Sequence, residues 1–431
     1  MQVQSDRTLS DWLAYIESVH PRTIDLSLDR PRRVIHQLRP VRPAVVITVA
    51  GTNGKGSTAA MLDAVYRAAG YRVGTYTSPH LVQYGERVRI NGKHARDDKL
   101  CQAFCRVDRA RGMIPLTYFE FGTLAALDIF SDSDLDIWIL EVGMGGRLDA
   151  VNILDPDLAV ITSVGMDHEA WLGDSRDAIG KEKAGILRFR GRSVISDPSP
   201  PATLLFRVEA LDCQARLINR DYRIRNVSKG RWSFTADADF WPGRSVINSC
   251  EIDATSPVWA QNVAGALASL RSLTDLAPIE ANHLGVLQNF SVPARQQRRP
   301  GPVTTWFDVA HNLQAVSALA EQLEADCVQG TTRAVFSMLQ DKDIAGTIEV
   351  MKDCVDSWYL AELEGPRALG ISELRTSLSG VEVADLAIST PPRAVYRAAL
   401  EDSQPGDRIV VFGSFYLVGD ILDWESKGTP G

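Results

Sequence analysis

Short apolar runs alternate along this chain with segments whose apolar residues recur at helical intervals. Residues 45–50 form a β-branched run, a glycine-rich stretch follows, and residues 57–69 carry apolar side chains at helical spacing before Gly70. Further runs predict strands at residues 71–76, 137–140, 158–164, 303–309, 333–338, 357–361 and 408–412. Because most of these runs precede a helix-like segment, the chain is predicted to have an α/β fold with a mainly parallel, doubly wound sheet.

Two segments interrupt this alternation, and after a further helix a linker divides the chain. Residues 197–201 (DPSPP) predict a rigid loop, residues 217–251 alternate loosely as antiparallel strands would, and residues 260–276 have a helical pattern. Residues 293–302 are polar, basic and bounded by proline, which is typical of a linker. The chain is therefore predicted to form a domain of residues 1–294 and a smaller α/β domain of residues 295–431.

Composition narrows the class of protein. The 431 residues are 45% hydrophobic and 23% charged, which is near the globular average, and the formal net charge is −8. This charge argues against a protein that wraps nucleic acid, although it leaves room for a polyanion at one local site. No apolar run approaches the roughly 18 residues of a membrane span and the first ten residues are polar, so we expect no membrane association and a cytoplasmic location. The six cysteines form no C-x-x-C pair, which favours reduced thiols.

The main candidate for chemistry is the segment ITVAGTNGKGSTAAML at residues 47–62. Its glycines allow backbone N–H groups to approach an anion, the following helix start adds a positive dipole, and Lys55 adds a charge for phosphates. Ser57 or Thr58 can place a hydroxyl on Mg²⁺. The spacing is a variant of the usual phosphate loop, because Gly56 separates Lys55 from Ser57. The alternative is a glycine-rich turn that binds no ligand.

A Mg²⁺ ion held by phosphate needs a carboxylate nearby, and the apolar run at residues 137–140 ends at one, Glu141. Asp149 is a second candidate ligand, or else forms a surface ion pair with Arg147. The run at residues 158–164 leads to Asp167 and His168, which predicts a functional role for His168 at the same sheet edge. Lys183 and a nearby lysine lie in a helical frame and would normally form a solvated face.

Eight motifs in chain order resemble a known family. They are GTNGKGS, TSPHLVQYGERVRING, TYFEFGT, EVGMGGRLDAVNI, DHEAWLG, EKAGI, FDVAHN and FGSF. Together they resemble the bifunctional dihydrofolate synthase/folylpolyglutamate synthases of bacteria, which belong to the Mur-ligase superfamily. The similarity covers about residues 7 to 425.

This resemblance implies a P-loop ATPase-like N-terminal domain that binds ATP and a pterin, and a Rossmann-like C-terminal glutamate-ligase domain. ATP would phosphorylate a carboxylate of the substrate, and L-glutamate would displace the phosphate. The ATP phosphates would be bound by Gly51, Thr52, Asn53, Gly54, Lys55, Gly56, Ser57 and Thr58. Ser78 and Glu141, with Ser57, would hold a first Mg²⁺, and His168 and a carbamylated Lys183 would hold a second.

The resemblance also assigns residues outside the phosphate loop. From the C-terminal domain, the nucleotide would be contacted by Arg295, Asp308, His311 and Asn312. The resemblance implies that the catalytic residues are Lys55, His168, Lys183, Arg295 and His311. Substrate contacts are expected from Thr23, Ile24, Asp25, Leu26, Phe119, Thr123, Asp149 and Ala150. The expected partners are dihydropteroate, folates and L-glutamate, and the family is usually monomeric.

Some positions depart from the family pattern. They are Ser27, Val151, Ala294, Leu313, Tyr416 and Leu417. Most of them lie in or near the C-terminal domain, so they bear on glutamate binding more than on the use of ATP. Two alternatives therefore stay open: a Mur-type ligase that acts on a carboxylate other than a folate, and a nucleotide-binding protein without ligase activity.

Overall fold

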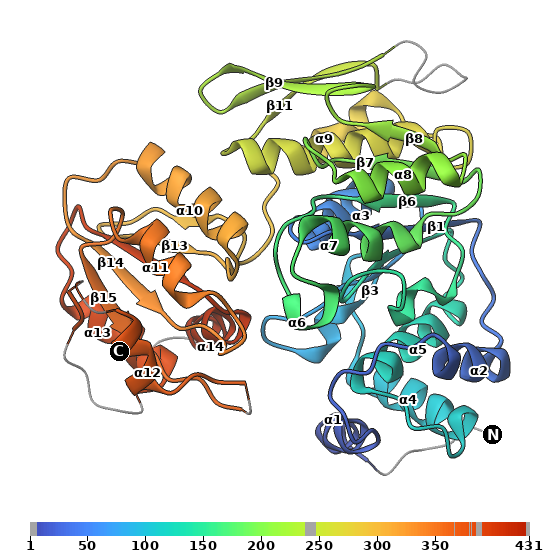
Figure 1. The fold of residues 1–431 in the computed structure, drawn as a ribbon, viewed down its shortest axis with the longest axis horizontal. Helices are drawn as coiled ribbons and strands as arrows, with labels where there is room; N and C mark the ends of the chain where they lie inside the picture. The colour runs from blue at the N-terminus through green and yellow to red at the C-terminus, as the bar shows by residue number, and fades with distance from the viewer. Residues whose placement is uncertain are drawn as a thin grey trace. The chain divides into compact units, whose positions relative to one another are not determined.

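The computed structural model describes residues 7–237, 247–365, 367–378, 380, 382–384 and 390–427. The chain divides into two compact units (Figure 1). The first comprises Met1–His80, Tyr84–Gly165 and Glu169–Phe290, and the second comprises Leu81–Gln83, Met166–His168 and Ser291–Gly431. Two short segments from the N-terminal half of the chain thus pack with the second unit.

An eight-stranded sheet forms the centre of the first unit in the described part of the chain. In spatial order its strands are β4 (Lys93–His94), β3 (Val88–Ile90), β2 (Val73–Tyr76), β5 (Ile137–Glu141), β1 (Val45–Ala50), β6 (Leu158–Ile161), β7 (Arg192–Ile195) and β8 (Gln214–Leu217). All neighbouring pairs from β2 to β8 are parallel, whereas β3 pairs antiparallel with both β2 and β4. The central strands β5, β1 and β6 are buried along their whole length, which explains their continuous apolar runs.

Helices of the first unit pack against this sheet or against one another. They are α1 (Leu9–Ser18), α2 (Asp29–Leu38), α3 (Lys55–Ala68), α4 (Asp97–Arg111), α5 (Tyr118–Ser131), α6 (Glu169–Leu172), α7 (Arg176–Lys183), α8 (Ala202–Ala210) and α9 (Pro257–Ser272). Short 3₁₀ turns are η1 (Tyr84–Arg87), η2 (Ala150–Ile153), η3 (Ala184–Ile186) and η4 (Ala281–Leu287). Helix α3 packs against β1, β2, β5 and α9, so the segment that follows the phosphate loop lies in the core. None of the helices in the described ranges combines the length and the apolar character that a membrane crossing requires.

A separate three-stranded antiparallel sheet in the first unit is formed by β9 (Tyr222–Ser228), β10 (Arg231–Ala236) and β11 (Ser249–Asp253). Strand β10 lies in the middle and pairs with both neighbours. This agrees with the antiparallel strands predicted within residues 217–251, of which residues 238–246 lie outside the described residues.

The second unit has a five-stranded sheet, counted over its described residues, in the order β12 (Gln297–Arg299), β13 (Thr304–Phe307), β16 (Arg408–Phe412), β14 (Thr332–Phe336) and β15 (Ser357–Leu360). Only β12 is antiparallel to its neighbour among these strands. Its helices are α10 (Leu313–Ala325), α11 (Ile344–Met351), α12 (Ile371–Ser377), α13 (Pro392–Glu401) and α14 (Phe415–Ser426). Buried side chains on both sides of this sheet form two apolar clusters, around Trp358 and around Phe307.

The predicted α/β class with a mainly parallel sheet is confirmed. Residues 293–302, which were predicted as a linker, are in part a strand, because residues 297–299 form β12. An edge strand is hydrogen-bonded on one side only and has no need of an apolar sequence, so its polar residues hid it. The helix predicted at residues 260–276 is shifted and ends at Ser272, and the strand predicted at residues 158–164 ends at Ile161.

Candidate active site

The predicted phosphate loop lies between β1 and α3 in the first unit. Gly54 is the N-cap of α3 and has a φ of 85°, a left-handed conformation in which a Cβ would be strained. The first turn of α3 presents backbone N–H groups and the positive end of the helix dipole. Lys55 folds back over the loop, and its Nζ donates to the carbonyl oxygens of Gly51 (3.0 Å) and Thr52 (3.1 Å). Such an arrangement can bind a polyphosphate.

Residues at the end of β6 hold this loop in shape. The hydroxyl of Thr52 donates to the carbonyl of Gly165 (3.0 Å) and accepts from its N–H (2.9 Å). The carbonyl of Asn53 accepts from the hydroxyls of Thr162 (2.6 Å) and Ser163 (3.1 Å). The loop conformation is therefore built by the neighbouring strand end.

Glu141 lies next to the loop. It is the last residue of β5 and is only 3% exposed. Its Oε2 accepts from the backbone N–H of Ser78 (3.1 Å), and a Cβ added to Gly56 would lie 3.5 Å from the same oxygen. The structure thus brings together the phosphate loop and two of the predicted metal ligands.

The residues around Glu141 fit a Mg²⁺ ion that is shared with a nucleotide. Mg²⁺ is typically bound by one or two carboxylates together with hydroxyl, water and phosphate oxygens. Within the described ranges no group of three or more His, Cys, Asp and Glu residues is arranged for a metal. Ser57 is buried in the first turn of α3, and the buried hydroxyl of Thr58 has no hydrogen-bond partner. An unsatisfied buried hydroxyl at this place fits a bound ligand.

Lys183 is the last residue of α7 and is 2% exposed. A Cβ on Gly146, in the turn that follows Glu141, would lie 3.2 Å from the Cα of Lys183. Arg147 of the same turn donates its N–H to the carbonyl of Glu182 (2.8 Å) and pairs with the Glu182 carboxylate (2.9 Å). The end of α7 is therefore packed against the turn that begins at Glu141. The expectation that Lys183 lies on a solvated face of its helix is therefore wrong.

Asp149 is buried, and the alternative that it forms a surface ion pair with Arg147 is wrong. Arg147 pairs with Glu182, whereas the Asp149 carboxylate accepts the backbone N–H groups of Met144 (3.0 Å) and Val151 (2.9 Å). Burial raises the pKa of Asp149 to about 7, against the opposing effects of these N–H groups and of the Lys55 charge. Asp149 caps η2, whose first residue is the buried Ala150.

The predicted pterin residues also lie in the first unit. Phe119 and Thr123 are on α5, and a Cβ on Gly143, after Glu141, would lie 2.6 Å from the Phe119 ring. The Thr123 hydroxyl donates to the carbonyl of Phe119 (2.8 Å) and lies 3.3 Å from the Tyr76 hydroxyl, so it is occupied within the fold. The remaining substrate candidates precede α2: Thr23 is exposed, and Ile24, Asp25 and Leu26 are half-buried.

The second unit holds the other predicted nucleotide residues. The carboxylate of Asp308 accepts the N–H groups of Gln296 and Ala310, both at 2.7 Å. Burial raises its pKa, and the charge of Arg295 partly offsets this. Arg295 lies 5.0 Å from the centroid of the Phe415 ring, and the His311 ring is 5.9 Å from the same ring. Asn312 caps α10 through its Oδ1.

Asp167 connects several of these residues, and it was not among the predicted site residues. Its carboxylate accepts from Lys342 (2.5 Å) and from the amide of Asn312 (3.1 Å), and it lies 3.6 Å from His311 Nε2. Burial alone would raise the pKa of Asp167, but His311, His168 and Lys342 hold it far below its ordinary value. Its neighbour His168 has a φ of 53°, which is uncommon for a residue with a side chain. In the sequence, only the position of Asp167 next to His168 indicated a functional role for it. No feature of the sequence indicated Lys342.

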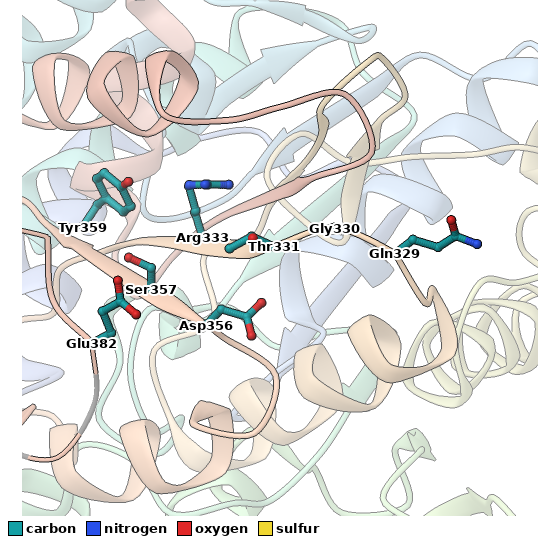
Figure 2. Close-up of a pocket in the computed structure, with 8 residues that line it drawn as sticks. All are labelled: Gln329, Gly330, Thr331, Arg333, Asp356, Ser357, Tyr359 and Glu382. Carbon is teal, nitrogen blue, oxygen red and sulfur yellow. The ribbon is translucent and has the colours of Figure 1, made fainter.

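A hollow of about 510 Å³ in the second unit lies apart from these residues (Figure 2). It is lined by Gln329, Gly330, Thr331, Arg333, Asp356, Ser357, Tyr359 and Glu382, around the amino ends of β14 and β15. Arg333 is bonded to Asp407 (2.6 Å) and Tyr359 donates to Asp402 (2.8 Å). Ligands of parallel sheets bind at the carboxyl ends of the strands, so this hollow is not the candidate active site.

Comparison with known proteins identifies the family of this chain. Residues 49–268 match the model of the Mur ligase middle domain, and residues 294–415 match that of the Mur ligase, glutamate ligase domain. The dihydrofolate synthase/folylpolyglutamate synthase of Escherichia coli (strain K12) is 39% identical over 424 residues, which is 97% of this chain and 96% of that protein.

Two solved structures have the same fold over the whole chain. E. coli FolC in complex with DHPP and ADP has a TM-score of 0.90 at 37% identity and covers 99% of both chains. A bifunctional folylpolyglutamate synthase/dihydrofolate synthase with Mn, AMPPNP and L-glutamate bound has a TM-score of 0.87 at 36% identity, over 99% of this chain and 100% of that one. This chain therefore belongs to the dihydrofolate synthase/folylpolyglutamate synthase family of Mur ligases.

Proposed function

We propose that this protein is an ATP-dependent ligase that joins L-glutamate to dihydropteroate, which forms dihydrofolate, and adds further glutamates to reduced folates. The observation that carries this proposal is the position of Glu141 beside Gly56 and the N–H of Ser78, where a phosphate loop meets a buried carboxylate. The relatives with DHPP and ADP, and with Mn, AMPPNP and L-glutamate, support the choice of substrates.

The chemistry explains why this ligase needs ATP. A carboxylate is a poor acyl donor, because its leaving oxygen would be strongly basic. Transfer of the terminal phosphoryl group of ATP to a carboxylate oxygen forms an acyl phosphate and releases ADP. The amino nitrogen of L-glutamate then attacks the carbonyl carbon; the C–N bond forms, the C–O bond to phosphate breaks, and the nitrogen loses a proton. Because negative charge is spread over the transferred group, catalysis depends mainly on positioning and on cations.

The first unit would supply the positioning for phosphoryl transfer. We assign the ATP phosphates to the backbone of residues 51–58 and to the Lys55 ammonium, which already lies over the loop. Ser57, Ser78 and Glu141 would hold a first Mg²⁺, which supplies positive charge when it is bound. His168 and Lys183 would hold a second. Carbamylation, in which the amine adds CO₂ and loses a proton, would turn Lys183 into an oxygen ligand, and its 2% exposure fits a modified side chain inside the fold.

The other residues have roles that the family resemblance supports. Arg295, Asp308, His311 and Asn312 would bind the nucleotide, with Arg295 as a further cation for the transferred group. The pterin would be bound by residues 23–26, Phe119, Thr123, Asp149 and Ala150. We also propose a monomer, and a cytoplasmic location stays a prediction from the sequence.

A coupled assay tests the proposal. Purified protein with Mg²⁺ and ATP should release ADP only when dihydropteroate and L-glutamate are both present, and mass spectrometry should detect dihydrofolate. Lys55→Ala should abolish both signals, whereas Lys99→Ala, at an exposed lysine of α4, should leave them unchanged. ADP release with another carboxylic acid but not with dihydropteroate would favour a Mur-type ligase. Nucleotide binding without turnover on any acid would leave only a binding protein.

A further inference from the structure

Arg30, near the start of α2, contacts both segments that are proposed to bind the pterin. Its Nη2 donates to the backbone carbonyl of Asp25 (2.6 Å), and its Nη1 donates to the Asp25 carboxylate (3.2 Å). On the other side, its Nε donates to Oε2 of Glu120 on α5 (3.2 Å), and Nη2 lies 3.0 Å from Oε1 as an ion-pair contact. One guanidinium therefore joins residue 25 to the helix that carries Phe119 and Thr123.

Burial makes these contacts significant. The side chains of Arg30 and Glu120 are 18% and 5% exposed, so water competes weakly for their charges. Glu120 is itself fixed, because its Oε2 accepts the N–H of Thr117 (2.8 Å) in the capping box of α5. His20 Nε2 lies 3.4 Å from the Asp25 carboxylate, which gives the segment a second point of attachment.

The geometry requires an arginine. A planar guanidinium can donate in several fixed directions at once, whereas the ammonium of lysine is a single point charge. Lysine at position 30 could pair with Asp25 or with Glu120, but it could not reproduce the fork that spans both. The helices α2 and α5 pack against each other, so the distance that Arg30 bridges is set by the fold (Figure 1).

We propose that Arg30 is a positioning residue for the pterin: it fixes residues 23–26 against α5 and so sets the affinity for dihydropteroate. This inference rests on the proposed function, because it assumes that residues 23–26 and α5 bind the pterin. Arg30 acts through Asp25 and Glu120 and needs no contact with the reacting atoms.

The test compares Arg30→Lys with Arg32→Lys, an exposed arginine on the same helix. In Arg30→Lys we expect the KM for dihydropteroate to rise about tenfold, as for the loss of one charge-assisted hydrogen bond. The KM for ATP and kcat should change less than about twofold, because the phosphate loop is untouched. Hydrogen exchange of the amides of residues 20–28 should become faster, and Arg32→Lys should match the wild type in every measurement.

A second variant guards against a folding defect. Glu120→Gln keeps an oxygen acceptor but removes the charge, so it should raise the KM for dihydropteroate in the same direction by a smaller factor. The inference is overturned if Arg30→Lys behaves like Arg32→Lys, or if the KM values for ATP and dihydropteroate rise together. A wild type that makes no dihydrofolate would reject the proposed function instead, and unchanged exchange of residues 20–28 in Arg30→Lys would still reject the positioning role.

Discussion

Gly54→Ala tests how tightly the phosphate loop is constrained, and Gly70→Ala is its matched control. Both glycines have nearly the same φ, 85° and 87°. A Cβ at Gly54 would lie 2.3 Å from Oδ1 of Asn262, which is 8% exposed on α9, whereas a Cβ at Gly70 would have no neighbour within 4 Å. The two substitutions therefore share the backbone strain and differ in the clash.

The expected losses of stability follow from the backbone strain and from the clash with Asn262. The left-handed conformation costs an alanine roughly 1 kcal/mol, and the gain from a stiffer unfolded chain is the same for both variants. The Asn262 side chain must also leave its rotamer, which adds about 1 kcal/mol or more. We therefore expect Gly70→Ala to lower the free energy of unfolding by about 1 kcal/mol or less, and Gly54→Ala by about 2 kcal/mol or more.

Urea unfolding and calorimetric titration with AMPPNP measure the two consequences. Gly54→Ala should also weaken AMPPNP binding at least about tenfold, since the loop that presents its N–H groups is displaced, while Gly70→Ala should bind normally. The double variant Gly54→Ala/Asn262→Ala should recover part of the stability in a double-mutant cycle. Equal losses for the two glycine variants, or no coupling between positions 54 and 262, would refute the reasoning.

Three further predictions follow from burial. Glu141→Gln should lower the affinity for Mn²⁺ in the presence of AMPPNP at least about tenfold, measured by calorimetry, because the 3% exposed carboxylate loses its charge; unchanged affinity would exclude Glu141 as a ligand. Burial raises the pKa of the Cys250 thiol to about 11. Because the thiolate is the form that reacts, the rate of its alkylation by iodoacetamide, followed by mass spectrometry, should increase about tenfold per pH unit between pH 7 and pH 9. Alkylation of Cys250 at pH 8 as fast as that of the exposed Cys327 would contradict this prediction. Phe121→Ala should lower the free energy of unfolding, measured in urea, by about 3–5 kcal/mol, because the ring is fully buried and its centroid lies 5.9 Å from that of the Phe104 ring. A loss below about 1 kcal/mol would contradict this, because it would mean that the surrounding side chains fill the cavity.

The phosphate loop could be predicted because local chemistry determines it. An apolar strand, three closely spaced glycines and a helical pattern follow one another within 16 residues, and the structure has them as β1, the loop in which Gly54 has a φ of 85°, and α3. Glu141 could be predicted for a similar reason: it is the charged residue that ends a buried strand, and parallel strands deliver such residues to one edge.

Other parts depend on contacts that no local pattern encodes. Strands β3 and β4 are short and carry Arg89, Lys93 and His94, so no apolar run marks them. Helix α2 is mostly polar, with only Pro31 and Val34 buried. Arg30 and Glu120 are 90 positions apart in the sequence, and Asp167 and Lys342 are 175 positions apart. In the sequence, these four charged residues cannot be distinguished from ordinary surface residues.

The hydroxyl and amide contacts from the end of β6 to Thr52 and Asn53 have a thermodynamic consequence for ligand binding. The conformational entropy that this loop loses is lost when the chain folds, since ordering a residue costs about 1–2 kcal/mol whenever it occurs. Nucleotide binding then requires no further ordering of this loop, so it avoids the loss of conformational entropy that a flexible loop would undergo on binding.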